Sequence, residues 1–152
     1  MRRILLDANL LVLLLVGLHD STMIGRHKRT REYSPSDYDL LQEVLNGFDE
    51  VLVTTSVLTE CSNLVRQVSE PACTELTQLL GRFTESARER TISAAEVVAE
   101  AHFPRLGFTD AGLLQSVGVD SPLLTVDLDL YLAAYDRVPG AATNFNHLRD
   151  VA

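Results

Sequence analysis

The 152-residue sequence predicts a three-layer α/β/α fold, in which helices cover both faces of a mostly parallel sheet. Two observations lead to this prediction. Short apolar runs of strand length alternate along the chain with segments of helical periodicity, which is the pattern of βαβ units. The first run, residues 3–6, is apolar at almost every position, as expected of a strand that is buried on both faces. No repeat or long linker divides the chain, so residues 1–152 are expected to form one domain.

The composition narrows the classes of function. An apolar content of 46% favours a globular protein over a disordered one. The net charge of −8 gives no general attraction to nucleic acid, so binding of that kind would need a local basic patch. Cys61 and Cys73 lie in apolar helical patterns and are expected to be reduced core residues. The four histidines show no ligand spacing, which argues against a zinc site.

The N-terminus resembles a signal peptide only superficially. Two arginines precede an apolar run, but Asp7 and Asn9 interrupt it. The uninterrupted stretch of residues 10–18 is too short to span a bilayer, and no cleavage site of small residues follows. We therefore expect a soluble, cytoplasmic protein with no membrane segment.

The first elements follow directly from the apolar pattern. Residues 3–6 form a strand that ends at the carboxylate of Asp7. Residues 10–16 are apolar on all sides and predict a helix that is almost wholly buried, with Gly17 as its C-terminal stop. The pattern is lost over residues 18–33, which predicts a loop.

The next elements carry clear start signals. Ser34 and Pro35 are typical of a helix N-cap and first position. Residues 50–55 are short and β-rich and predict a second strand. Ser56 is then expected to cap a helix over residues 57–68.

The second half continues the alternation. A helix restarts at Pro71, and residues 88–92 are expected to form a short edge strand. Ser93 and Glu96 match a capping box for a helix over residues 94–101. Residues 103–108 read as a loop.

The last elements repeat the arrangement of the first. A helix opens at Thr109 and Asp110, and residues 122–127 predict a strand that again ends in a carboxylate. A helical segment follows over residues 128–135, and after a Pro-Gly turn residues 141–145 form a last small strand.

Four acidic residues occupy related places in this scheme. Asp7 and Asp127 end strands, while Glu60 and Asp110 lie near the start of helices, and in a doubly wound sheet all of these places face one edge. Converging carboxylates repel each other unless a cation is present, and Mg²⁺ or Mn²⁺ prefer such oxygen ligands. A bound divalent ion can activate water near neutral pH and neutralise charge on a phosphodiester.

Simpler roles exist for each acid taken alone. Asp7, Asp110 and Asp127 could be ordinary helix caps, and Glu60 an ordinary solvated helix residue. The chain offers no other evident chemistry, because it lacks a glycine-rich phosphate loop and a nucleophile with a plausible histidine partner. Haloacid-dehalogenase-like phosphatases need a second Asp where Asn9 lies, and receiver domains need a Lys after the last strands.

With these residues in view, the chain resembles the PIN-domain family of metal-dependent nucleases. The resemblance covers essentially the whole chain and rests on short motifs in the family's order, namely Leu5-Leu6-Asp7-Ala8-Asn9, Thr59-Glu60, Phe108-Thr109-Asp110, Leu124-Thr125-Val126-Asp127 and Thr143-Asn144-Phe145. It implies a compact five-stranded parallel sheet, an acidic metal site and cleavage of single-stranded RNA. Many bacterial members are toxins that a partner protein, the antitoxin, holds in check.

The resemblance also implies a role for each acid. Asp7, Glu60, Asp110 and Asp127 would form the catalytic quartet. Asp7 and Asp110 would be the main ligands of Mg²⁺ or Mn²⁺, with Asp127 close to the ion directly or through water. Glu60 would orient a water or hold a second ion.

Three neighbouring positions modify this picture. Asp129 competes with Asp127 but is expected to be a helix N-cap, and Asn144 is either a polar accessory of the site or part of a turn. The family's first motif usually carries Thr or Ser after its Asp, whereas this chain has Ala8 and lacks that hydroxyl. A second interpretation is therefore a catalytically weak or inactive module that binds RNA or a protein partner.

One strongly basic stretch lies in the loop before residue 34. Its exposed charges would either contact the RNA backbone beside the acidic centre or belong to a solvated flexible loop, and they come from Arg26, Lys28, Arg29 and Arg31. The expected partners are an RNA substrate, an antitoxin protein and a second copy of the chain in a homodimer, with no membrane contact.

Overall fold

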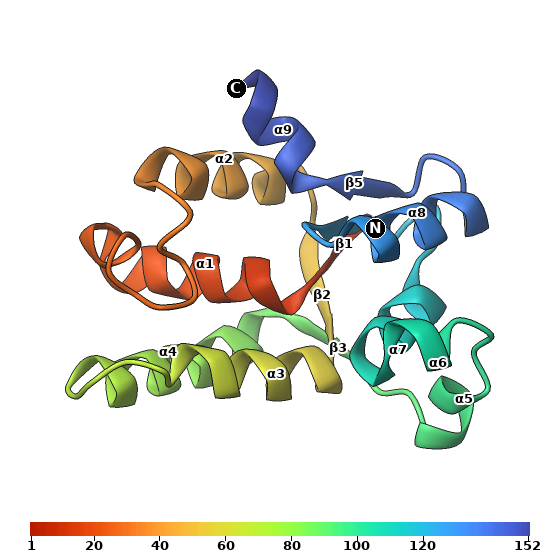
Figure 1. Cartoon of the computed structure of the whole chain (residues 1–152), viewed down its shortest axis with the longest axis horizontal. Helices are drawn as coiled ribbons and strands as arrows, with labels where there is room; N and C mark the ends of the chain where they lie inside the picture. Colours follow the sequence, from red (N-terminus) through yellow and green to blue (C-terminus); the bar gives the residue numbers. More distant parts are fainter.

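The computed structural model describes residues 1–152 and confirms the three-layer α/β/α fold (Figure 1). All five strands are parallel and lie in the order β3-β2-β1-β4-β5. The strands are β1 (Arg3–Leu6), β2 (Glu50–Thr54), β3 (Arg88–Arg90), β4 (Leu123–Thr125) and β5 (Ala142–Asn144). Parallel pairing brings the carboxyl ends of β1 and β4 to the same edge of the sheet.

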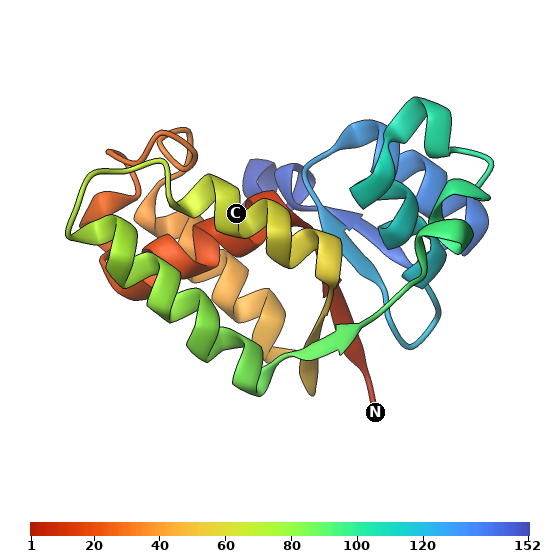
Figure 2. The same cartoon turned by 90° about the horizontal axis from the view of Figure 1, so that it is seen from below.

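Helices lie on both sides of this sheet. In Figures 1 and 2 the first four helices gather on the left and the group from α5 to α8 on the right. The helices are α1 (Ala8–His19), η1 (Ser21–Met23, a 3-10 turn), α2 (Pro35–Asn46), α3 (Thr55–Val65), α4 (Ala72–Ser86), α5 (Ala94–Val98), α6 (Phe103–Leu106), α7 (Phe108–Ser116), α8 (Leu128–Arg137) and α9 (Phe145–Val151). No helix has the length and apolar character needed to cross a membrane.

The centre of the core is β1 together with α1. Leu5 and Leu6 are fully buried, and every side chain from residue 10 to residue 16 is buried as well. Helix α1 packs against α2, α3 and α4, so it has no solvent-facing side over these turns. Burial on all sides explains the unbroken apolar sequence and fixes the direction in which β1 delivers Asp7.

The prediction that Gly17 ends the first helix is wrong, because α1 continues to His19. A Cβ atom on Gly17 would lie 2.2 Å from the ring of Tyr38 in α2. Glycine therefore stands here because two helices approach closely. The helix stops at Asp20, whose extended backbone leaves the helical region.

Other boundaries also differ from the sequence prediction. Helix α3 begins at Thr55, with the Thr54 hydroxyl as its N-cap in place of Ser56. The expected loop over residues 103–108 contains the short helix α6. The chain also ends in an unpredicted helix, α9, whose N-cap is the side chain of Asn144. Of the two roles considered for Asn144, the structure shows the local one, at the end of the strand.

Candidate active site

Asp7 lies where β1 passes into α1, and the residue is only 5% exposed. One oxygen, Oδ1, accepts a hydrogen bond from the backbone N–H of Ala8 at 2.7 Å. The other, Oδ2, accepts one from the hydroxyl of Thr125 at 2.6 Å. Burial raises the pKa of Asp7 above its ordinary value, against the opposing effect of these two hydrogen bonds. Asp7 is thus both a helix cap and a buried acid at the sheet edge.

Asp127 is joined to Asp7 through Thr125. The Thr125 oxygen that donates to Asp7 also accepts a hydrogen bond from the backbone N–H of Asp127 at 3.0 Å. The Asp127 carboxylate caps α8 by accepting from the N–H of Leu130 at 3.0 Å. The expectation that Asp129 caps this helix is wrong, since Asp129 lies exposed in the first turn.

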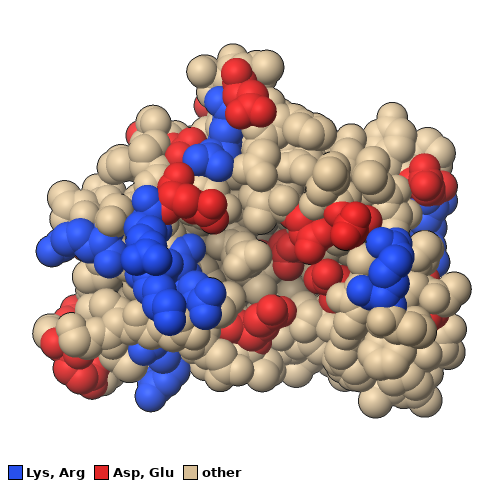
Figure 3. Space-filling view, viewed as in Figure 1, with Lys and Arg blue, Asp and Glu red and all other residues tan.

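Asp110 and Glu60 complete the acidic group. Asp110 lies in the first turn of α7, half-buried, and Glu60 is exposed on α3. Burial raises the pKa of Asp110 to about 7, and the negative charges of Asp7, Asp127 and Glu60 contribute to the shift. The structure therefore brings all of the predicted acids into one electrostatic neighbourhood. Figure 3 shows acidic side chains gathered around a hollow on this face.

None of these acids has a positively charged partner. Elsewhere in the chain, buried and half-buried acids are paired with arginine, as in Glu100 with Arg137. Arg149 contacts Asp37 at 3.2 Å, and Arg3 contacts Glu50 at 2.6 Å. These arginines lower the pKa of each paired acid, whereas the pKa values of Asp7 and Asp110 are raised. The negative charge at the carboxyl edge of the sheet is thus uncompensated by the protein.

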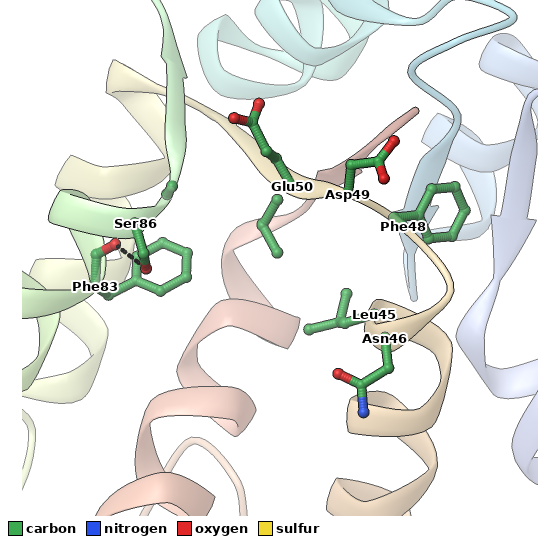
Figure 4. Close-up of a pocket in the computed structure, with 9 residues that line it drawn as sticks. Leu45, Asn46, Phe48, Asp49, Glu50, Phe83 and Ser86 are labelled. Carbon is green, nitrogen blue, oxygen red and sulfur yellow. Dashed lines mark hydrogen bonds between the residues drawn. The ribbon is translucent and has the colours of Figure 1, made fainter. Parts of the chain in front are cut away.

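A cavity of about 270 Å³ lies elsewhere, around the start of β2 (Figure 4). Its lining includes Leu45 and Phe83, with Asp49 and Glu50 at the rim. Glu50 pairs with Arg3 and Arg88, and Asp49 accepts a hydrogen bond from the backbone N–H of Arg2. This cavity lies at the amino end of the strands and contains none of the predicted site residues.

The donor chemistry of the acidic group fits a hard divalent cation, because every available ligand atom is a carboxylate oxygen. The positions of the side chains fit less closely. No group of three His, Cys, Asp or Glu side chains lies close enough together to hold one metal ion. The acids therefore lie close enough for their negative charges to interact, but no three of their side chains form the coordination sphere of one ion.

Comparison with known proteins gives a likeness of fold. The crystal structure of PAE2754 from Pyrobaculum aerophilum matches this chain with a TM-score of 0.54 at 17% sequence identity, covering 97% of this chain and 92% of that chain. The likeness is one of architecture. At this identity it supports the α/β fold and carries no information on activity. Neither the family models nor the curated proteins compared with the chain contain a match.

The basic loop lies on the same face as the acidic group, to its left in Figure 3. It is anchored from within, since His27 is buried and its Nε2 donates to the carbonyl of Val65 at 3.0 Å. The N–H of Arg29 donates to His27 Nδ1 at 3.0 Å, and the buried Thr30 hydroxyl donates to the Ile24 carbonyl at 2.8 Å. The loop therefore projects its exposed charges from a hydrogen-bonded base, and these charges belong to Arg26, Lys28, Arg29 and Arg31.

Two features of the site are not predicted by the sequence patterns. One is Thr125, whose hydroxyl links Asp7 to the backbone of Asp127. The sequence feature that indicates this role is its position as the last residue of an apolar strand, two residues before an acid. The other is a groove of about 350 Å³ between α3 and α7, which shares Glu60 with the acidic group. No sequence pattern indicates this groove, because it depends on how two helices pack.

Proposed function

We propose that this chain is an endoribonuclease that depends on Mg²⁺ or Mn²⁺ and cleaves single-stranded RNA, as the resemblance to PIN-domain nucleases implies. One observation carries the proposal. The buried carboxylate of Asp7 shares an uncompensated negative field with Asp110, Asp127 and Glu60 at the carboxyl edge of a parallel sheet. Burying charge without a partner destabilises a protein, so such a cluster suggests a cation-binding function.

Asp7 and Asp110 would hold the divalent ion, with Asp127 next to it. Such an ion supplies an activated water and stabilises the charge that develops on a phosphodiester. The hydrogen bond from Thr125 keeps one Asp7 oxygen fixed, so that the carboxylate is oriented before a cation arrives. Glu60 is exposed on α3 and can move without disturbing the core, which suits it to orient a water.

The basic loop supplies positive charge for the RNA phosphates that do not lie at the acidic centre. An RNA strand brings a phosphate at every nucleotide, and only the reacting one can lie at the cation. Arg26, Lys28, Arg29 and Arg31 would bind the neighbouring phosphates from the same face of the molecule. Their anchoring by His27 reduces the conformational entropy lost when RNA binds.

Two observations favour a second candidate, a catalytically weak or inactive module that binds RNA or a protein partner. Ala8 provides no hydroxyl beside Asp7, and no three acids are arranged to hold one ion. The two candidates differ in a direct way. An enzyme turns over RNA when the cation is added, whereas a binding module retains RNA or protein intact.

A cleavage assay decides between them. Single-stranded RNA is incubated with the protein and Mn²⁺ or Mg²⁺, with EDTA as one control and Asp7→Asn as another. We expect cleavage that is lost in both controls and kept in Asp136→Asn, which removes an exposed acid from the last turn of α8. Cleavage that persists with EDTA and in Asp7→Asn would show that the metal-dependent assignment is wrong.

The remaining expectations are part of the same proposal. A cytoplasmic location, a role as the toxin of a toxin–antitoxin pair, a protein inhibitor and a homodimer are all predictions. Light scattering on the purified chain tests the dimer. Co-expression with a candidate inhibitor protein tests the inhibitor, and a stable complex that suppresses RNA cleavage is the expected result.

A further inference from the structure

The groove between α3 and α7 has a lining suited to a neutral ligand. Its volume is about 350 Å³, which is at the small end of the range of about 300–1,000 Å³ for small-molecule sites. It contains no lysine or arginine, and it borders the acidic group at Glu60. A phosphate would be repelled by that carboxylate, while an uncharged ring would not.

One wall of the groove is the ring of Phe108 at the start of α7. Phe108 and Tyr135 are the only exposed residues among the phenylalanines and tyrosines, and Phe108 is 42% exposed. The ring is held in place by Phe103, at 6.3 Å between centroids and an angle of 84° between planes. Gly107, at φ +90°, turns the chain from α6 into α7 and so sets the position of Phe108.

The opposite wall is one face of α3. Thr55, Thr59 and Asn63 follow each other at intervals of four residues, so their side chains lie in a row along the helix. The two threonine hydroxyls already donate hydrogen bonds, to Glu89 and to the backbone of α3. The Asn63 amide makes no hydrogen bond within the chain and is exposed. It therefore offers both donors and an acceptor to a ligand.

We propose that this groove binds one unpaired nucleobase of the RNA, next to the phosphate at the acidic centre. This inference rests on the proposed function. The base stacks on Phe108, and its edge receives hydrogen bonds from Asn63. Stacking needs an open face of the base, and the bases of a duplex have none to offer. The groove thus selects single strands, loops and bulges, and Phe108 is the residue that determines this selection.

The test measures binding and does not depend on cleavage. A short single-stranded RNA carrying the fluorescent base 2-aminopurine is titrated with the protein. Ca²⁺ replaces Mg²⁺ and Mn²⁺ in the buffer, so that binding is measured without cleavage. We expect Phe108→Ala to lower affinity by about tenfold or more and to abolish the fluorescence change. Phe108→Tyr should keep both, and Tyr135→Ala, which removes the other exposed aromatic ring, should change neither. Circular dichroism verifies that each variant is folded.

A second oligonucleotide separates stacking from a structural effect. An abasic site replaces the fluorescent base, and it should weaken binding to the wild type but not to Phe108→Ala. If the wild type binds RNA and Phe108→Ala binds it equally well, the inference is overturned while the nuclease proposal stands. The same unchanged RNA binding in Phe108→Ala is expected if the groove holds a protein segment in place of a nucleobase, and it overturns the inference in that case too. If the wild type neither binds nor cleaves RNA, the proposed function itself is wrong.

Discussion

The hydroxyl of Thr125 donates a hydrogen bond of 2.6 Å to Oδ2 of Asp7, joining residues that lie 118 positions apart. The bond crosses from β4 to β1 at the edge where both strands end. The same hydroxyl oxygen accepts from the backbone N–H of Asp127, so one side chain links the Asp7 carboxylate to the backbone of Asp127. It also counteracts the burial that raises the pKa of Asp7.

Replacement of Thr125 by valine tests this arrangement. Thr125→Val keeps the shape but leaves a buried Asp7 oxygen without its donor, which we expect to lower the free energy of unfolding by about 1–3 kcal/mol. The pKa of Asp7 rises further, and affinity for Mn²⁺ falls by about 10–100-fold. Chemical denaturation and calorimetric titration measure the two effects. Thr125→Ser retains the hydroxyl and should stay close to the wild type. Equal losses in both variants would show that packing, and not the hydrogen bond, matters here.

The pair Asp127 and Asp129 allows a matched comparison on one helix. Asparagine is as good an N-cap as aspartate, so Asp127→Asn should fold normally while it loses a charge from the site. We expect RNA cleavage to fall by about tenfold or more in Asp127→Asn. The exposed Asp129 lies in the first turn of the same helix, and Asp129→Asn should keep its activity. The reverse result would assign the role to Asp129.

The sequence was sufficient for the sheet and for the grouping of the acids. Strand ends are readable when a carboxylate follows an apolar run, as at Asp7 and Asp127, and parallel pairing then brings these ends together. The contacts that depend on packing were not readable. Gly17 is an example, because a glycine in a helical pattern suggests a C-terminal stop. The actual reason for the glycine is the ring of Tyr38, which belongs to another helix and cannot be located from the sequence. The C-terminal helix was missed because Phe145 is its only buried residue.

Interactions between distant residues were the hardest part of the site to foresee. Thr125 resembles any strand residue until β1 is placed beside it. The groove beside Phe108 exists only because α3 and α7 meet. Residue spacing also does not indicate that the acids share a neighbourhood without forming a group of three metal ligands. Such geometry depends on side-chain rotation, which residue spacing does not determine.

The titration of Asp110 predicts how the metal-free protein responds to pH. Its pKa is about 7 in the folded chain and ordinary, near 3.8, in the unfolded chain. The folded state therefore binds this proton more tightly, and stability falls as pH rises from about 4 through 7. Thermal melts in EDTA should show this fall, and Asp110→Asn should flatten it. Mn²⁺ binds the ionised carboxylates, so it should raise the melting temperature more at pH 8 than at pH 6. A melting temperature unaffected by millimolar Mn²⁺ at either pH would count against a cation site.

The basic loop predicts a particular dependence of RNA binding on salt. Each phosphate contact to single-stranded RNA contributes about −0.7 to the slope of log affinity against log salt concentration. Removing the charges of Arg26, Lys28, Arg29 and Arg31 should reduce the magnitude of that slope and weaken binding most at low salt. The charges are exposed, so replacing all of them with alanine should preserve the fold.

A control variant separates specific contacts from the general effect of charge. Arg82→Ala removes an exposed positive charge from the last turns of α4, toward the amino end of the sheet. It should be compared with Arg29→Ala, which removes one charge from the loop. If the loop contacts RNA, Arg29→Ala should reduce the magnitude of the salt slope by about 0.7, the contribution of one phosphate contact. Arg82→Ala should leave the slope unchanged. If both variants shift equally, the loop contributes only to net charge. RNA would then reach the acidic centre without contacting the loop. Direct contacts with the loop would make Arg29→Ala differ from Arg82→Ala.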